Sequence, residues 1–318
     1  MSGIDVIIPS WDGRPLLQDC LRALAAQTLA PEEVIVVDNG SSDGTEDWLR
    51  ATWPSVRLIR LEVNQGFAGA VQEGVESTAS ELVAILNNDA RPHQAWLEAS
   101  AAVFEEKAVG ACASVILVPG GTVESAGLAM SIWGVGRRHM EGARPDDLPR
   151  EPFEVFGASG GAAVFRREAL IAAGGFDRSF FAQDEDIDLA FRVRNAGFIC
   201  VVQPRAVVVH LGGQTLRRSP TLLLALAQRN LEWAFWSNTP WWWWPVFGVL
   251  HVGYQGASVI RHAVAGRGRT VLKAKWAAFA GPPSRLRRGR PLSGFSRRVA
   301  PWFFVAQRPW TRSKTAPP

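Results

Sequence analysis

The chain of 318 residues is 47% apolar and 20% charged, a composition that excludes an intrinsically disordered protein and allows one large or two ordinary domains. Its net charge of +4 is the sum of two unlike parts. The N-terminal part, residues 1–210, is acidic (the front), with 29 acids and 17 bases, and the C-terminal part, residues 211–318, is basic (the back), with 17 bases and one acid. Because the front is acidic and no nucleic-acid-binding motif is present, we expect no nucleic-acid partner.

Short β-branched runs alternate with helical patterns over the first 120 residues. The first two runs, Ile4–Pro9 and Glu33–Asp38, contain few polar residues, as expected of strands buried on both faces. Similar runs follow at Val56–Leu61, Leu82–Leu86 and Val109–Val118, and helices are expected after Pro15, from Glu46, up to Thr78 and after Pro92. The alternation predicts an α/β fold with a doubly wound, mostly parallel sheet that binds ligands at the carboxyl ends of its strands.

Two aspartates, Asp38 and Asp89, stand at such strand ends. An isolated aspartate at a strand end is usually a helix cap or a turn residue. Two of them at equivalent places on one sheet edge favour a binding site.

The stretch Phe180 to Arg192, FFAQDEDIDLAFR, places four carboxylates among large apolar side chains. The pattern predicts the start of a helix, where acids are stabilised by the helix dipole. An ordinary amphipathic helix with an acid-rich first turn would show the same pattern. Further on, His210 ends the strand predicted at Ala206–Val209; a histidine there is usually structural, but its position after the acidic helix allows it to face the same cleft.

Several common site signatures are absent from the sequence. There is no Walker A sequence, and no GxGxxG motif follows the first strand, which argues against a dinucleotide site. No nucleophile-elbow signature of a serine hydrolase occurs either. The three cysteines, Cys20, Cys112 and Cys200, are far apart and form no CxxC pair, so we expect reduced, buried thiols and no zinc site.

Six segments, in order, resemble the family 2 glycosyltransferases, and most closely the rhamnosyltransferase-like branch that acts on bacterial polysaccharides. The segments are VIIPSWDGRPLLQDCLRAL, VIVVDNGSSDGT, NQGFAGAVQEG, LNNDA, GGFDRSFFAQDEDIDLAFR and VVVHLGGQT, which together cover about residues 4–215. Two positions depart from the family pattern. Asp12 stands where the family often has Asn, and Asn87 replaces the first acid of the family's Asp-x-Asp motif.

The resemblance implies a GT-A fold, a Rossmann-like mixed sheet flanked by helices, and an inverting transfer from a nucleotide-diphosphate sugar. Asp89 and His210 would hold Mg²⁺ or Mn²⁺, which neutralises the diphosphate leaving group. Asp38 would accept the imide N–H of uracil or thymine, so the donor would be a dTDP- or UDP-sugar. The nucleotide-sugar pocket implied by the resemblance contains Pro9, Asp12, Asp38, Asn39, Gly66, Asn88 and Asp89.

Direct displacement requires one general base beside the acceptor hydroxyl, and the resemblance assigns it to Asp186. Glu185 and Asp188 remain alternatives, because spacing does not distinguish them, and Asp188 is also placed to pair with Arg192 one turn along. Two carboxylates that flank a glycosidic bond would instead indicate a hydrolase. That interpretation leaves Asp38 and Asp89 without a role.

The back third is basic and rich in tryptophan, with nine of the 14 tryptophans after residue 210. Pro240–Ile260 contains no Asp, Glu, Lys or Arg, and we expect a helix that lies at the membrane interface, in preference to a membrane span or a soluble packing helix. Arginines and lysines from Arg261 onward would attract an anionic leaflet. The sequence is therefore divided into a catalytic domain, 1–215, and a helical membrane-associating extension with a disordered tail, 216–318.

Together these features predict an inverting, metal-dependent glycosyltransferase at the cytoplasmic face of a bacterial inner membrane, peripheral rather than spanning. It would transfer a sugar, with rhamnose as one candidate, to a glycan or lipid-linked glycan in the synthesis of cell-surface polysaccharide. The Gln-x-x-Arg-Trp motif of processive synthases is absent at residues 228–233, so we expect addition of one or a few sugars. The alternative is a non-catalytic subunit that binds a nucleotide sugar and recruits partners to the membrane.

Overall fold

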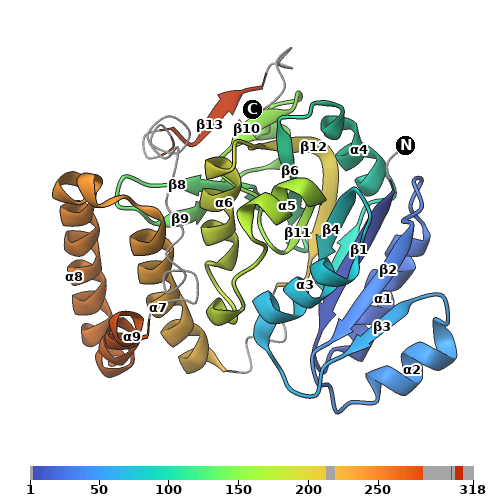
Figure 1. Ribbon diagram of the computed structural model, residues 1–318, viewed down its shortest axis with the longest axis horizontal. Helices are drawn as coiled ribbons and strands as arrows, with labels where there is room; N and C mark the ends of the chain where they lie inside the picture. Colours follow the sequence, from blue (N-terminus) through green and yellow to red (C-terminus); the bar gives the residue numbers. More distant parts are fainter. Residues whose placement is uncertain (1–2, 213–218, 282–301, 303–304, 311–318) are drawn as a thin grey trace.

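The computed structural model describes residues 3–212, 219–281, 302 and 305–310. Within these residues a large mixed sheet has the strand order β13-β10-β12-β6-β11-β4-β1-β2-β3 (Figure 1). Its N-terminal half is parallel and consists of β1 (Ile4–Ser10), β2 (Glu33–Asp38), β3 (Arg57–Arg60) and β4 (Leu82–Leu86). The carboxyl ends of these strands meet at one edge, as the sequence predicted.

The second half of the sheet mixes strand directions. Strand β11 (Ala162–Arg166) is antiparallel to both β4 and β6 (Val109–Leu117), while β12 (Ile199–His210) is parallel to β6. The strand predicted at Ala206–Val209 is thus the last part of a longer strand, with a register shift between Val202 and Val207. The remaining strands are β5 (Ala90–Pro92) on β12, β7 (Val123–Ala126) on β6, β10 (Phe153–Val155) on β12, and the separate hairpin β8 (Leu128–Met130) with β9 (Gly136–Arg138).

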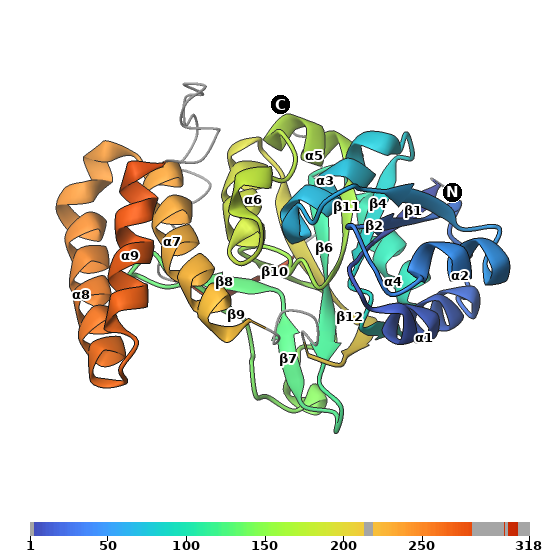
Figure 2. The same ribbon diagram turned by 90° about the horizontal axis from the view of Figure 1, so that it is seen from below.

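Helices cover both faces of the sheet, which explains why its strands read as continuous apolar runs. Side chains alternate along β1, so that Ile7 packs beneath α3 while Ile8 packs on the α1 side. Figure 2 shows the two layers. One contains α3 (Gly66–Ser77), α5 (Arg167–Ala173) and α6 (Glu185–Asn195), and the other contains α1 (Arg14–Ala25), α2 (Thr45–Thr52) and α4 (Trp96–Ala101).

Three further helices, α7 (Pro220–Asn238), α8 (Val249–Val264) and α9 (Gly268–Ala280), form a bundle beside α6 (Figures 1 and 2). A separate apolar cluster joins the bundle to α6 and the segments beside it; its large aromatic members include Phe156, Phe180, Phe191, Trp233 and Phe235. The predicted helix over Pro240–Ile260 is not uniform. A 3-10 turn (Trp241–Trp243) and a π-helical turn (Trp244–Gly248) precede α8, and no helix in the described part of the chain is long and apolar enough to cross a membrane.

The chain returns to the main sheet after the bundle. Strand β13 (Gln307–Pro309) pairs with β10, and the Trp302 ring lies 4.1 Å from the guanidinium carbon of Arg194 in α6. The predicted extension 216–318 therefore does not form one separate unit, because its last described residues belong to the sheet. The predicted boundary at residues 215/216 and the tail 312–318 lie outside the described residues. All three cysteines are buried free thiols, as expected, and burial raises the pKa of Cys112 to about 12.

Arg194 provides a test of how α6 is held to the edge of the sheet at β10. Its buried guanidinium donates hydrogen bonds to the carbonyls of Val155 and Phe156 and pairs with Glu154 at 2.9 Å. We expect Arg194→Ala to lower the free energy of unfolding by about 3 kcal/mol, since it leaves these acceptors unpaired. Urea denaturation measures the change, and the exposed Arg22→Ala serves as control. A change below about 1 kcal/mol would contradict the assignment.

Candidate active site

Two adjoining pockets open at the carboxyl edge of the parallel strands, and Phe67, Asn87 and Leu223 line both of them. The first pocket, of about 180 Å³, contains five of the seven residues predicted for the nucleotide sugar: Pro9, Asn39, Gly66, Asn88 and Asp89. The second pocket, of about 500 Å³, is lined by Glu185, Asp186 and His210 among others. The structure thus brings the acidic helix start and the strand-end residues into one continuous cleft.

The loop before α3 shapes the first pocket, and Asn39 fixes its backbone. The Asn39 amide donates to the Gly66 carbonyl at 2.9 Å, and its oxygen accepts the Gln65 N–H at 2.8 Å. Gly66 has φ +74°, and a Cβ there would lie 2.3 Å from the carbonyl oxygen of Phe181. Only glycine allows this approach. The glycine therefore joins the first pocket to the loop that leads into α6.

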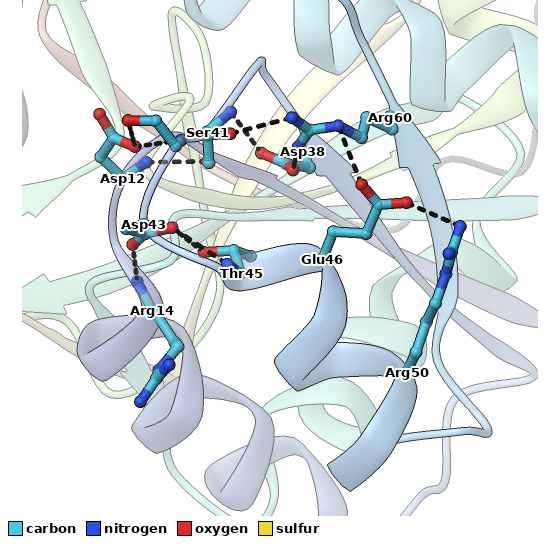
Figure 3. Close-up of polar contacts among 10 residues, drawn as sticks. Asp12, Arg14, Asp38, Ser41, Asp43, Thr45, Glu46, Arg50 and Arg60 are labelled. Atoms are coloured by element: carbon cyan, nitrogen blue, oxygen red, sulfur yellow. Dashed lines mark hydrogen bonds and ion pairs between the residues drawn. The ribbon is translucent and has the colours of Figure 1, made fainter.

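Asp38 and Asp12 lie beside the first pocket, in the polar network of Figure 3, and do not line it. The Asp38 carboxylate is fully buried, accepts the Ser41 N–H at 3.0 Å and pairs with Arg60. Asp12, with φ +46°, accepts the Ser42 N–H at 2.7 Å. Because Asp38 is fully buried and does not line the pocket, its contact with a base would require movement of the residues that cover it, and that predicted role remains a prediction.

His210 connects Asp89 to a second acid that lies on β7. Its Nε2 is 3.0 Å from Asp89 Oδ1, and its Nδ1 is 2.7 Å from Glu124 Oε2. Burial lowers the pKa of His210, but the hydrogen bonds to Asp89 and Glu124 outweigh burial and raise it to about 9. The same arrangement suits a metal ligand, because an Nδ1–H bond to a carboxylate orients the ring and leaves Nε2 to face the cation.

The chain offers few other ligands at this point. Among the described residues, no group of three or more His, Cys, Asp or Glu side chains is placed to hold a metal ion. Asp89 and His210 therefore fit a cation that takes its remaining oxygen ligands from a bound diphosphate.

The loop from Phe181 to Asp184 holds the acidic helix start in the second pocket. Phe181, Gln183 and Asp184 all have positive φ, between 60° and 75°, which is strained for residues with side chains. Helix α7 supports this loop. The buried Asn230 amide nitrogen lies 2.9, 2.8 and 2.7 Å from the carbonyl oxygens of Phe180, Ala182 and Gln183.

Glu185 and Asp186 face the second pocket with different protonation tendencies. Burial and the neighbouring Asp186 raise the pKa of Glu185 well above its ordinary value, and its buried Oε2 has no hydrogen-bond partner among the described residues. Burial also raises the pKa of Asp186, but hydrogen bonds from the N–H groups of Gly160, at 3.1 Å, and Ile187, at 2.8 Å, counteract it. The structure thus stabilises the ionised form of Asp186 relative to that of Glu185 and fixes the Asp186 carboxylate.

Asp188 is not a base candidate, which corrects one alternative left open by the sequence. Its side chain is 1% exposed, does not line the pocket, and forms an ion pair with Arg192 at 2.7 Å. Its other oxygen accepts a hydrogen bond from Asn238 of α7 at 2.8 Å. Position i+2 on a helix points away from position i, so Asp188 turns inward while Asp186 faces the pocket.

Three contributors to the site were missed by the sequence interpretation: Glu124, Arg138 and Asn230. Glu124 accepts from His210 and also pairs with Arg138 of β9 at 3.0 Å. The only signal was an acid in the short segment Val123–Ala126, which the structure shows to be a buried strand, because a buried carboxylate requires a partner. Nothing in the local pattern around Asn230 marked its role, which depends on how α7 packs.

Comparison of the sequence with known proteins shows to which family the chain belongs. A family model described as Glycosyl transferase family 2 matches residues 5–174. The chain belongs to glycosyl transferase family 2. Over 265 residues this glycosyltransferase is 27% identical to the N-acetylglucosaminyl-diphospho-decaprenol L-rhamnosyltransferase of Mycobacterium tuberculosis, a match that covers 72% of this chain and 86% of the relative. It is 29% identical over 217 residues to the O-antigen biosynthesis protein RfbC of Myxococcus xanthus, covering 64% of this chain and 17% of that protein.

Solved structures confirm the predicted GT-A fold of this glycosyltransferase. The mannosyltransferase of Pyrobaculum calidifontis, in complex with GDP-Man and Mn²⁺, matches with a TM-score of 0.56 at 21% identity, covering 91% of this chain and 79% of that one. GalNAc-T7 with UDP, GalNAc and Mn²⁺ also gives a TM-score of 0.56, at 16% identity, covering 66% of this chain and 43% of that one.

The pKa of Asp184 yields a stability prediction. Burial and the charge of Asp186 raise this pKa to about 7. Above pH 7 the folded state therefore carries a charged Asp184, which water solvates better in the unfolded state, so that this charge is a penalty on the stability of the folded state. Asp184→Asn removes this penalty, and asparagine tolerates positive φ. We expect it to raise Tm by about 2–4 °C at pH 8 and by less at pH 5.

Thermal unfolding at the two pH values measures the effect. The exposed Asp146→Asn is the control and should leave Tm unchanged at both. An equal or larger gain for Asp184→Asn at pH 5 would contradict the raised pKa.

Proposed function

We propose that this glycosyltransferase transfers a sugar from a dTDP- or UDP-sugar to a lipid-linked glycan, with inversion at the anomeric carbon. The observation that carries the proposal is the second pocket, in which the fixed carboxylate of Asp186 and the imidazole of His210 line one cavity. A base and a diphosphate-binding residue in one cavity provide what direct displacement needs.

The first pocket suits the donor. Three polar or small residues line this pocket from different places at the sheet edge: Asn39, Gly66 and Asn88. Asp89 also lines the pocket and contacts His210, which lines the second pocket. A bound Mg²⁺ or Mn²⁺ would supply charge neutralisation for the diphosphate leaving group. Asp89 and His210 would hold it, while Glu124 keeps the His210 ring in the required orientation.

Asp186 would accept the proton of the acceptor hydroxyl. Its carboxylate is held by backbone N–H groups on both oxygens, so little reorientation is required during transfer. Glu185, in its protonated form, cannot take that proton and can donate a hydrogen bond to a sugar oxygen. The acceptor type rests on the mycobacterial relative, whose name specifies a lipid diphosphate carrying N-acetylglucosamine, and the same relative makes L-rhamnose a candidate donor sugar.

The helix bundle would hold the enzyme on the membrane that contains such an acceptor. Helix α8 has its polar side chains inside, with His251 and Gln255 at 0% and 6% exposure. Its apolar side chains point outward, with Val252 and Ile260 at 59% and 66% exposure. This is the reverse of a helix on a water-facing surface and suits contact with lipid.

Neighbouring side chains extend that surface. The exposed large apolar residues nearby are Trp241, Trp242, Val249, Val264, Leu272, Trp276 and Phe279. Exposed cations stand among them at Arg261, Arg267, Arg269 and Lys273, which would attract anionic headgroups. We propose peripheral attachment at the cytoplasmic face of a bacterial inner membrane, in the synthesis of cell-surface polysaccharide.

Substitution of the proposed base tests the chemistry. Asp186→Asn should lower kcat by about 10²- to 10⁴-fold, because the acceptor hydroxyl loses its proton acceptor. Transfer is measured across a panel of dTDP- and UDP-sugars with lipid-linked acceptors, and Asp146→Asn should retain full activity. Wild-type activity in Asp186→Asn would exclude this base. Nucleotide binding by the wild type without turnover on any member of the panel would favour the non-catalytic alternative.

Metal binding is tested separately from turnover. UDP or dTDP should raise the Tm of the wild type when Mn²⁺ or Mg²⁺ is present and much less in EDTA, because binding to the folded state alone stabilises it. In the Asp89→Asn variant, most of the metal-dependent rise in Tm should be lost. An unchanged metal-dependent shift in that variant would contradict the proposed ligand.

Membrane attachment is tested on vesicles that contain anionic phospholipid. Val252→Asp should weaken binding about tenfold, because it places a charge on the lipid-facing side of α8. Ile171→Asp on α5 is a matched control, since Ile171 has the same 59% exposure. Equal binding by the two variants would contradict docking through α8.

A further inference from the structure

The β8–β9 hairpin links the second pocket to the helix bundle. At one end, Gly136, Arg137 and Arg138 line the pocket together with Asp186. At the other end, the Trp133 carbonyl accepts a hydrogen bond from the His251 ring of α8 at 2.8 Å. In Figure 1 the hairpin extends from the sheet toward α7 and α8. The hairpin therefore connects the pocket wall to α8, which it meets on the buried side that contains His251.

The bundle end of the hairpin is tightly fixed. The Trp133 ring stacks on Tyr254 of α8, with centroids 6.4 Å apart. Gly134 lies so close to Phe235 of α7 that an added Cβ would approach the ring to 2.2 Å. The hairpin therefore holds its pocket end at a set distance from the surface of α8.

The two arginines at the pocket end differ in their partners. Arg138 pairs with Glu124 at 3.0 Å and with Glu141 at 3.6 Å, so its charge is already balanced. Arg137 is exposed, lines the pocket, and has no carboxylate partner among the described residues. Because the pocket wall also contains the Asp186 carboxylate, an anionic ligand would be repelled from it unless a free cation compensates.

We propose that Arg137 binds the diphosphate of a lipid diphosphate-linked acceptor. This inference rests on the proposed function and specifies its acceptor. A guanidinium matches phosphate oxygens with a two-pronged hydrogen bond, which lysine does not. The acceptor sugar then lies at Asp186 and its diphosphate at Arg137, on the side of the pocket from which the hairpin leads to the bundle. The donor diphosphate remains at Asp89 and His210.

Binding of a short polyprenyl diphosphate to the full chain tests the site without requiring transfer. The assay is run in EDTA, so that the metal site does not capture the diphosphate, with the matching polyprenol as reference. We expect the wild type to bind the diphosphate at least tenfold more tightly than the alcohol. Arg137→Ala should lose that preference and Arg137→Lys should keep part of it, while the exposed Arg150→Ala, outside this pocket, should keep all of it.

Kinetics then separates the acceptor from the donor. With the same glycan presented on a lipid diphosphate or as an uncharged alkyl glycoside, Arg137→Ala should raise KM about 10- to 100-fold for the first acceptor only. A rise in the donor KM instead would place Arg137 on the donor diphosphate, and an unchanged diphosphate preference in the binding assay would exclude it altogether. Failure of the wild type to transfer to any acceptor, with the binding preference intact, would overturn the proposed function but not the anion site.

Discussion

Asn230 holds the backbone between Phe180 and Gln183 in place, and the arrangement of the cleft depends on this support. The loop contains three side-chain-bearing residues with positive φ, a conformation that costs about 1–3 kcal/mol for each and persists only when its surroundings fix it. Asn230 binds the loop carbonyls from the bundle side, and Gly66 leaves room for the loop from the sheet side. Helix α6 begins directly after this loop, so its first carboxylates take their direction from it.

This dependence explains which parts of the site could be predicted from the sequence. Asp89 follows one strand and His210 ends another, so periodicity placed both at the same edge of the sheet. Their contact depends on the pairing of β5 with β12, in which Ala90 lies opposite His210, and the sequence pattern did not show that pairing. The order of the motifs then identified the family. Asp38 also ends a strand, but its pairing with Arg60 from the neighbouring strand depends on a register that a sequence does not display. Likewise, Asp186 and Asp188 can be told apart only when it is known which side of α6 packs against the rest of the protein.

The bundle shows a second limit of sequence interpretation. An apolar, tryptophan-rich segment with nearby arginines indicated a membrane surface, but composition could not tell which side chains face outward. The structure places the polar residues of α8 against Glu232 and Lys275, whose ion pair at 2.7 Å lies inside the bundle. The apolar side chains are consequently left outside. The return of the chain to the sheet at β13 was also invisible locally, because a three-residue edge strand carries almost no periodic signal.

The central claim is that the sugar is transferred by a single direct displacement, with Asp186 as the base. The anomeric configuration of the first product tests the direct displacement most directly. Nuclear magnetic resonance of the product formed early in the reaction should show the configuration opposite to that of the donor sugar. A product with the donor's configuration would require either a covalent intermediate on a second carboxylate or attack from the leaving-group side, and would contradict the account.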